Sequence, residues 1–319
     1  MPDGGDALVL TTVPTIGDIA PAEWDACAGA DNPFVGHAFL KALEDSGSVG
    51  RRTGWQPLYP TIRDSGGALI ACAPMYLKGH SNGEYVFDHG WAQAYERAGG
   101  KYYPKLLVAV PFTPVPGPRL LARPDAATQS ARTTLARGIV EVARRLNLSS
   151  LHINFPHEDD KSCLEELGLM QRLGCQYHWH NRGYGSFDEF LNDLSSRKRK
   201  MIRRERRQAV ADGIVLRALT GPDIQSHHWD AFFAFYMDTG ERKWGRPYLT
   251  RGFFDCIGQF MADRVVLMLA EMEGRPVAGA LNFRGKDALY GRNWGCLADY
   301  KFLHFETCYY QAIDYAIAQ

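Results

Sequence analysis

The sequence has few features of a secreted, membrane-spanning or metal-binding protein. Its seven cysteines are scattered and none forms a Cys-x-x-Cys pair, so we expect reduced thiols rather than a disulfide, zinc or redox framework. It contains no run of about 18 apolar residues, which predicts no membrane span. The first six residues carry two acids and no base, unlike a secretory signal. We therefore expect a cytoplasmic location.

The chain also lacks net charge, because 36 basic residues balance 36 acidic residues. This balance argues against a partner such as DNA that is bound through overall charge, and any polyanion site must come from a local cluster. The motifs GxGxxG, GxxxxGK[ST], HExxH and GxSxG are absent, which disfavours dinucleotide, P-loop, zinc-protease and hydrolase functions. Two histidines flank Trp179, but no third ligand is near them in sequence, so we predict no metal site.

What is present is typical of a globular protein, with 45% hydrophobic and 23% charged residues. A length of 319 residues predicts two domains, and a faint internal repeat supports this division. Glu23-Trp24-Asp25-Ala26 and His228-Trp229-Asp230-Ala231 each begin a helix, a proline-containing loop and a second helix. We expect one core near each of the two tryptophans.

The parallel between the halves continues through strands and a helix. Apolar runs around turn residues predict antiparallel hairpins over 58–77 and 265–283. A third strand is expected to end at His89-Gly90-Trp91 in one half and at Asn293-Trp294-Gly295 in the other. Helical spacing then predicts helices over 132–146 and 305–317.

The first half continues beyond its helix, whereas the second half does not. A strand at 150–155, a helix at 158–169 and a strand at 174–180 follow in the first half. We predict an α/β (α+β) protein with domains at 1–182 and 183–319, each with a mixed, mostly antiparallel sheet flanked by helices. Since the second sheet has no closing strands, we expect that domain to be truncated at its C-terminus.

The strongest local signal is the basic strip, residues 197–207 (RKRKMIRRERR), in which eight of eleven residues are basic. We expect it to lie in one helix from about Phe187 to Gly213. In a neutral chain, such a strip predicts an anionic partner: a nucleotide, coenzyme A or tRNA. The alternative is a solvated helix face paired with acids. The candidate phosphate-binding residues are Arg197, Arg199, Lys200, Arg203, Arg204 and Arg207.

Three further segments carry candidate site residues. The predicted loop 238–248 (DTGERKWGRPY) mixes charges with aromatics, as site loops do, although it could simply connect two helices. His304, near the start of the last helix, is a candidate general base, and Glu306 is its candidate partner. A structural histidine and an acid that suits the helix dipole are the alternatives. The candidate substrate-binding residues are Asp238, Lys243, Trp244, Tyr248, Arg292, Asn293 and Trp294.

These segments resemble a known family. Leu194-Ser195-Ser196 and the basic strip resemble the basic segment of Fem-type peptidoglycan aminoacyltransferases, which consist of two tandem acyltransferase domains of the GNAT type. The stretches TGERKWGRPYLTRGFF and LHFETCYYQAIDYAI resemble a FemAB-like bacterial family of peptidoglycan biosynthesis/recognition. The resemblance extends from about Pro21 to the end of the chain and implies two tandem GNAT-like domains.

The resemblance also implies a reaction, which is transfer of an acyl or aminoacyl group to an amine. The acceptor would be a small molecule or a peptide, such as a cell-wall precursor, and no cofactor would be tightly bound. The donor stays open between acyl-coenzyme A and aminoacyl-tRNA. The GNAT loop Q/R-x-x-G-x-G/A is missing from 116–121 and 297–304, and 213–229 is too short for a tRNA-associated helical arm. The alternative is a non-catalytic module that binds a polyanionic or peptidoglycan-related ligand.

Overall fold

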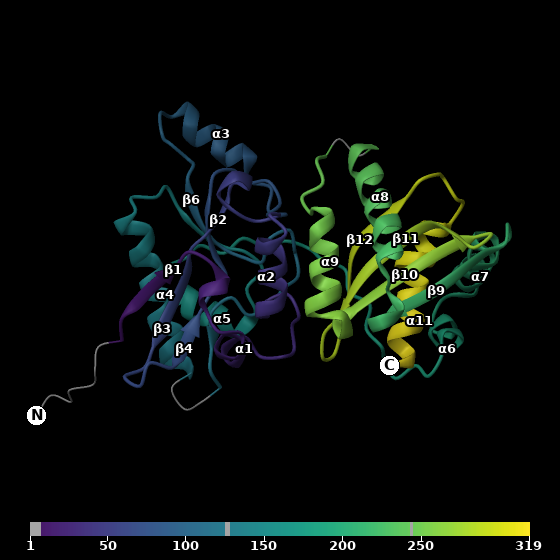
Figure 1. The fold of residues 1–319 in the computed structure, drawn as a ribbon, viewed down its shortest axis with the longest axis horizontal. Coiled ribbons are helices and arrows are strands. Elements are labelled where there is room, and N and C mark those ends of the chain that lie inside the picture. Colours follow the sequence, from purple (N-terminus) through teal and green to yellow (C-terminus); the bar gives the residue numbers. More distant parts are fainter. Residues whose placement is uncertain (1–7, 125–127, 243–244) are drawn as a thin grey trace, which may run out of the picture. The chain divides into compact units, whose positions relative to one another are not determined.

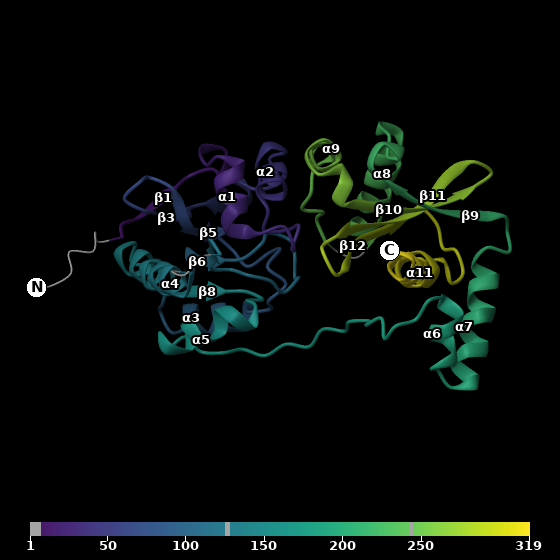
Figure 2. The same ribbon diagram turned by 90° about the horizontal axis from the view of Figure 1, so that it is seen from below.

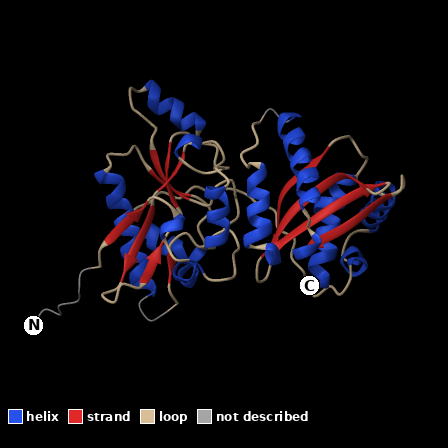
Figure 3. Ribbon diagram, in the orientation of Figure 1, coloured by secondary structure: helices blue, strands red, loops and turns tan. Residues whose placement is uncertain are grey.

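The computed structural model describes residues 8–124, 128–242 and 245–319. The chain forms two compact units, Met1–Arg172 and Leu173–Gln319, and each mixes helices with strands (Figure 3). The predicted α/β class is confirmed. The boundary inferred from the sequence, between residues 182 and 183, lies further along the same connecting segment and stays a prediction. Among the described helices, none is long and apolar enough to cross a membrane.

The first unit places short strands between its helices (Figure 1). Its strands are β1 (Leu10–Val13), β2 (Trp55–Pro57), β3 (Tyr59–Arg63), β4 (Leu69–Cys72), β5 (Met75–Lys78), β6 (Lys105–Val108), β7 (Leu121–Ala122) and β8 (Leu151–Ile153). Its helices are α1 (Pro21–Ala28), α2 (His37–Asp45), α3 (His89–Arg97), α4 (Thr128–Arg145) and α5 (Glu158–Glu166).

The strands of the first unit form two four-stranded sheets, in the orders β1-β3-β4-β7 and β2-β5-β6-β8. All neighbours are antiparallel except β6 and β8, which are parallel. Trp24 of α1 is fully buried, as predicted, and its ring meets Tyr59 edge-on with 5.5 Å between ring centroids. Leu135 and Ile139 of α4 lie one turn apart and are both buried in the core.

Two predictions for the first unit are wrong. Residues 89–91 do not end a strand, because they begin α3 (His89–Arg97), and the strand that follows β5 is β6 at Lys105–Val108. The carboxylate of Asp88 is held by Lys105 at 2.6 Å, so a contact distant in sequence fixes the start of α3. Residues 174–180 form no strand, and within the described chain they pair with no other strand.

The helices α6 (Phe187–Asn192) and α7 (Ser196–Ala209) precede the single sheet of the second unit. Its strands are β9 (Ile214–Thr220), β10 (Val265–Met272), β11 (Arg275–Arg284) and β12 (Leu289–Cys296). The further helices of the unit are α8 (Ser226–Arg242), α9 (Arg251–Phe260), α10 (Leu303–Phe305) and α11 (Gln311–Ala318), with a π-helical turn at Glu306–Tyr310 between the last two.

This sheet is antiparallel throughout, in the order β12-β11-β10-β9. Helices α8 and α9 cover one face, and α11 covers the other (Figure 2). Trp229 of α8 is only 3% exposed, as expected. A Cβ atom at Gly295 would lie 2.4 Å from the backbone of Phe235, so only glycine lets α8 approach β12 this closely. The hairpin predicted over 265–283 is confirmed as β10 and β11.

The predicted single helix from 187 to 213 is wrong. It is broken between α6 and α7, where the hydroxyl of Ser195 accepts a hydrogen bond from the Lys198 amide and caps α7. Leu194, between the helices, packs against the cluster of Phe187 and Ile202. The predicted loop at 238–248 is partly wrong, because α8 continues to Arg242. The last helix is confirmed, and it includes one π turn.

Candidate functional site

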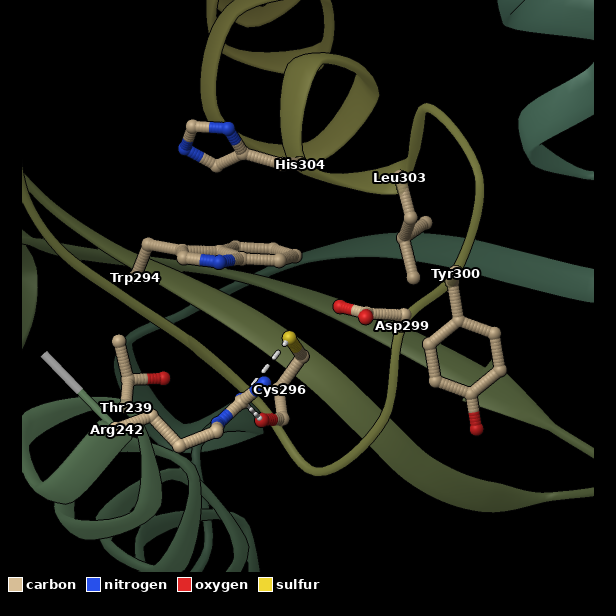
Figure 4. A pocket seen from close by; sticks show the side chains of 8 residues that line it. All are labelled: Thr239, Arg242, Trp294, Cys296, Asp299, Tyr300, Leu303 and His304. Carbon is tan, nitrogen blue, oxygen red and sulfur yellow. Dashed lines mark hydrogen bonds between the residues drawn. The ribbon is translucent and has the colours of Figure 1, made fainter.

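A pocket of about 250 Å³ lies in the second unit at the end of β12, and we call it the β12 pocket. It combines side chains from the last turn of α8, from β12 and from the segment that leads into α10 (Figure 4). The lining residues are Thr239, Arg242, Trp294, Cys296, Asp299, Tyr300, Leu303 and His304.

The sequence forms this pocket through simple periodicities. Trp294 and Cys296 are two residues apart on a strand and therefore share one face of the sheet. Thr239 and Arg242 are three residues apart and lie on one side of α8. The chain then turns at Phe302, whose φ of 63° is left-handed. This turn places Leu303 and His304 at the start of α10, beside the end of the strand.

Arg242 supplies the positive charge of the pocket. Its Nη2 atom lies 2.6 Å from Asp238 Oδ2 and donates a hydrogen bond of 2.5 Å to the carbonyl oxygen of Cys296. Hydrogen bonds to Cys296 and Asp238 raise the pKa of Arg242, so the guanidinium stays charged. A guanidinium carries five N–H groups, and these contacts do not use all of them. The remaining N–H groups can bind a carboxylate or phosphate oxygen.

Aromatic rings line the opposite side of the pocket. The ring centroids of Trp294 and His304 are 5.1 Å apart and the ring planes are tilted by 52°, with the imidazole next to the indole in Figure 4. Phe305 and Tyr309 extend this cluster, with centroids 5.5 and 5.9 Å from that of His304. Each of the two is 51% exposed. The pocket thus has an aromatic rim where a planar or apolar ligand group could stack.

The predicted site residues fall into separate places. Trp294 and His304 line the β12 pocket, and Asp238 supports it through Arg242. Arg292 and Asn293 lie earlier on β12 and are not part of the lining. The backbone N–H of Tyr248 donates to the hydroxyl of Tyr236. Lys243 and Trp244 lie outside the described residues.

Glu306 points elsewhere. It is 2% exposed, and its carboxylate accepts hydrogen bonds of 3.0 to 3.1 Å from Arg206 and one of 2.7 Å from Gln311. It is absent from the lining of the β12 pocket, to which His304 contributes. The structure therefore gives Glu306 a contact that ties α7 to the last helix, rather than a position beside His304.

The basic strip is divided into paired and exposed residues. Arg203 pairs with Asp188 at 2.8 Å, Arg206 pairs with Glu306 and Asp314, and Arg199 donates to Asn192. Four predicted phosphate-binding residues are exposed and, within the described chain, form no ion pair. They are Arg197, Lys200, Arg204 and Arg207, spaced along one face of α7, and we call them the α7 stripe.

A second pocket, of about 500 Å³, lies between α6, α7 and α11, and we call it the α6–α7 pocket. Its lining residues are Ser186, Phe187, Asp188, Leu191, Arg203, Arg206, Arg207 and Asp314. It contains two of the predicted phosphate-binding residues, Arg203 and Arg207, and two carboxylates that the sequence does not place there.

A buried charged cluster in the first unit was missed by sequence reasoning. Lys105 and Lys78 are paired in register on β6 and β5, and both are fully buried. Lys105 Nζ lies 2.9 Å from Glu84 and 2.6 Å from Asp88. Burial lowers the pKa of Lys78 to about 7. Lysines in short apolar strands were the available signal, because such residues seldom enter a core unpaired.

In the second unit, sequence reasoning missed most of the β12 pocket. Thr239 and Arg242 belong to the segment 238–248, which contains candidate site residues. Because this segment was predicted to be a loop, the helical spacing of the two residues was not recognised. Cys296 lies two residues after Trp294, and residues two apart on a strand face the same side of the sheet. This alternation could have placed Cys296 beside Trp294 in the pocket. Among the described residues, no group of histidine, cysteine and acidic side chains could hold a metal ion.

Comparisons with known proteins agree with these observations. A family model described as FemAB-like, peptidoglycan biosynthesis/recognition, matches residues 15–319. The crystal structure of FemX matches with 12% identity and a TM-score of 0.53, over 96% of this chain and 85% of that one.

A C-terminal domain (DUF2156) from Agrobacterium fabrum, described as part of a lysylphosphatidylglycerol synthetase, also matches with a TM-score of 0.53. Its identity is 9%, over 93% of this chain and 75% of that one. These two structures share the fold of this chain. No curated protein sequence matches it significantly.

Proposed function

The chain belongs to the FemAB-like family of peptidoglycan biosynthesis/recognition, and from this we propose that it transfers an acyl or aminoacyl group to an amine acceptor. The observation that carries the proposal is the β12 pocket. It brings an imidazole, a guanidinium and an aromatic wall together at the end of an edge strand. These are the groups that acyl transfer to an amine needs: a base, a stabilising charge and a binding surface.

The residues of the pocket have distinct roles in this reaction. The neutral amine attacks the carbonyl carbon of the donor, so that a C–N bond forms and the C–O or C–S bond to the leaving group breaks. His304 accepts the proton of the amine and returns it to the leaving oxygen or sulfur. Arg242, together with outward-facing N–H groups of β12, stabilises the negative charge on the carbonyl oxygen.

The α7 stripe supports a phosphate-bearing donor. Four exposed bases on one helix face attract a polyanion, and each phosphate contact adds a salt-dependent contribution to binding. Both donor candidates, acyl-coenzyme A and aminoacyl-tRNA, carry phosphates. The helix presents its charges as an extended row, which favours a ligand with successive phosphates. We therefore place aminoacyl-tRNA first and acyl-coenzyme A second.

The acceptor proposed here is the amine of a small molecule or peptide, and the family points to a peptidoglycan precursor. In both units a strand and two helices precede an antiparallel hairpin, although the short strand β2 comes before the hairpin in the first unit. We propose that the two units arose as a tandem pair of acyltransferase-like domains. Location in the cytoplasm and the absence of a tightly bound cofactor stay predictions.

One experiment tests the transfer. The protein is incubated with a mixture of charged tRNAs or with acetyl-coenzyme A, each with a peptide that contains lysine, and the products are read by mass spectrometry. The proposal is supported if the mass of the peptide increases with only one of the two donors, and that donor identifies the donor class. Binding of tRNA or peptide with no product from either donor would contradict it and favour the non-catalytic alternative.

A further inference from the structure

The α6–α7 pocket has an unusual balance of charge. Three guanidiniums and two carboxylates line it, and buried Phe187 and Leu191 form its apolar part. Arg206 is fixed inside this lining, because its guanidinium lies 4.2 Å from the centroid of the Phe187 ring and pairs with Asp314 at 2.7 Å. The pocket is thus built around an ordered cation instead of a flexible surface chain.

Some of these charges are satisfied and others are open. Arg203 forms an ion pair with Asp188 Oδ1, and Arg206 forms one with Asp314 Oδ2. Among the described residues, the second oxygen of each carboxylate has no hydrogen-bond partner, and Arg207 forms no ion pair. The open groups are therefore one guanidinium, which is a donor only, and two carboxylate oxygens, which are acceptors only.

This set of open groups discriminates between ligand classes. A phosphate or another multivalent anion would meet Arg207 but would also face Asp188 and Asp314, and like charges at short range oppose binding. A simple cation would meet the carboxylates but would face three guanidiniums. A molecule with both an ammonium and a carboxylate satisfies both sets, because each of its charges meets the opposite one.

We propose that the α6–α7 pocket binds a zwitterionic ligand, either a free amino acid or a short peptide that carries both an ammonium and a carboxylate. Its carboxylate binds Arg207, and its ammonium binds the open oxygens of Asp188 and Asp314. A carbon chain in the ligand lies over Phe187 and Leu191. A volume of about 500 Å³ is within the usual range for small-ligand pockets.

This assignment deepens the proposed function and rests on it in one respect, since an amino acid or a short peptide is one of the amine acceptors proposed for the transfer. It also revises the expectation that Arg203 and Arg207 hold phosphate, which leaves Arg197, Lys200 and Arg204 of the α7 stripe for the phosphates of the donor. Binding is measured without a donor, so each proposal can fail while the other holds. Transfer without zwitterion binding here would leave the reaction intact and remove the assignment of this pocket.

The test measures binding of small probes to the full chain by titration calorimetry. The probes are L-lysine, the dipeptide L-lysyl-L-alanine, cadaverine, glutarate and inorganic pyrophosphate. Cadaverine keeps ammonium groups without a carboxylate, and glutarate keeps carboxylates without an ammonium. We expect L-lysine or the dipeptide to bind at least tenfold more tightly than the other three, and the tighter of the two identifies the source. Equal or tighter binding of pyrophosphate would overturn the proposal.

Variants locate the binding. Arg207→Gln removes the open guanidinium and should weaken the zwitterion at least tenfold, because a charge-assisted hydrogen bond is lost. Lys198→Gln is the matched control, since Lys198 is an exposed base on the same helix outside the pocket lining. The affinity of this variant for the zwitterion should be unchanged. Asp188→Asn should weaken the zwitterion but not glutarate. Equal effects of Arg207→Gln and Lys198→Gln would show that net charge, rather than this pocket, governs binding.

Discussion

At the scale of single residues, His304 is an exposed side chain in the lining of the β12 pocket. Its ring lies against that of Trp294, and it is the second residue of α10 at the rim of the pocket. Histidine is the side chain whose ordinary titration lies nearest neutral pH, which suits it to accept and return a proton. Glu306, two residues later, is less suited to this role, because its carboxylate is buried and accepts hydrogen bonds from Arg206 and Gln311.

The first prediction concerns His304→Gln. The variant keeps the size and hydrogen-bonding ability of the side chain but cannot take a proton. We expect turnover to fall by about 10²-fold or more, with little change in thermal stability. The measurement is the initial rate of peptide modification across pH 6 to 9. His178→Gln, in the exposed connecting segment, is the control. Full activity of His304→Gln would exclude the imidazole as the base.

The second prediction concerns Lys78, which is fully buried and whose pKa burial lowers to about 7. Unfolded, a lysine titrates near 10.4, so between these values the unfolded chain binds more protons. The free energy of unfolding therefore rises with pH in this window, by at most about 1.4 kcal/mol per pH unit from this group. Lys78→Met should stabilise the protein near pH 7 and remove this rise.

The measurement is urea unfolding at half-unit steps from pH 7.5 to 9.5. The difference between wild type and Lys78→Met is compared at each pH, so that groups common to both cancel. Lys101→Met, at an exposed position, should leave the pH slope unchanged. A slope that is the same in Lys78→Met and wild type would mean that the buried ammonium does not titrate in this range.

At the scale of elements, α7 divides its charges between two tasks. Arg203 and Arg206 pair with acids of α6 and of the last helix segment, so they hold neighbouring elements together. The α7 stripe faces solvent, and like charges three and four residues apart on a helix are mildly unfavourable. A helix that keeps such a row without internal partners is best explained by an external anion.

The third prediction tests the α7 stripe. The triple variant Arg197→Gln, Lys200→Gln and Arg204→Gln should bind tRNA more weakly, and the slope of log affinity against log salt should fall by about 2 to 3 units. Stability should change by less than about 1 kcal/mol, because these bases form no ion pair within the described chain. Fluorescence anisotropy at several salt concentrations measures the slope.

The control removes three exposed bases from the first unit, through Arg51→Gln, Arg52→Gln and Lys101→Gln. It changes the net charge equally, and we expect the salt slope to be unchanged. If both triple variants lose the same affinity, tRNA binding reflects overall charge. If the α7 triple variant instead loses stability and keeps its affinity, the stripe is a structural helix face.

Sequence reasoning succeeded for elements whose signals are local. The hairpin of β10 and β11 and helices α4 and α11 follow from apolar periodicity within short windows. It failed where contacts between residues distant in sequence determine the bounds of an element. The bond from Lys105 to Asp88 fixes where α3 starts, and the cap of Ser195 breaks the basic helix. Likewise, the β12 pocket joins α8 to residues more than fifty positions away.

At the scale of the whole molecule, the chain consists of two compact units joined by one segment. Each unit buries its own tryptophan core, around Trp24 in one and Trp229 in the other. The proposed chemistry lies entirely in the second unit, where Leu303 and His304 line the β12 pocket and Asp314 of α11 lines the α6–α7 pocket. The buried lysines of the first unit take no part in the proposed chemistry.

The fourth prediction concerns the segment that joins the units. Residues 169–182 form neither helix nor strand, and nearly all of them are exposed. A protease needs an extended backbone, which this segment offers without unfolding. The α7 helix contains more trypsin sites, but its residues must leave the helix before they can be cut. We therefore expect brief trypsin treatment to cleave first at Arg172 or Arg182, which gives two fragments near the sizes of the units.

Mass spectrometry of the first fragments identifies the cut. The double variant Arg172→Gln and Arg182→Gln should slow this first cleavage at least tenfold, while Arg51→Gln with Arg52→Gln should not. First cuts within α7 would mean that this helix opens more readily than the connecting segment. The α7 stripe would then be ordered only when its anionic partner is bound, because bound phosphates would offset the repulsion between its bases and stabilise the helix. Added tRNA should in that case slow the cuts within α7.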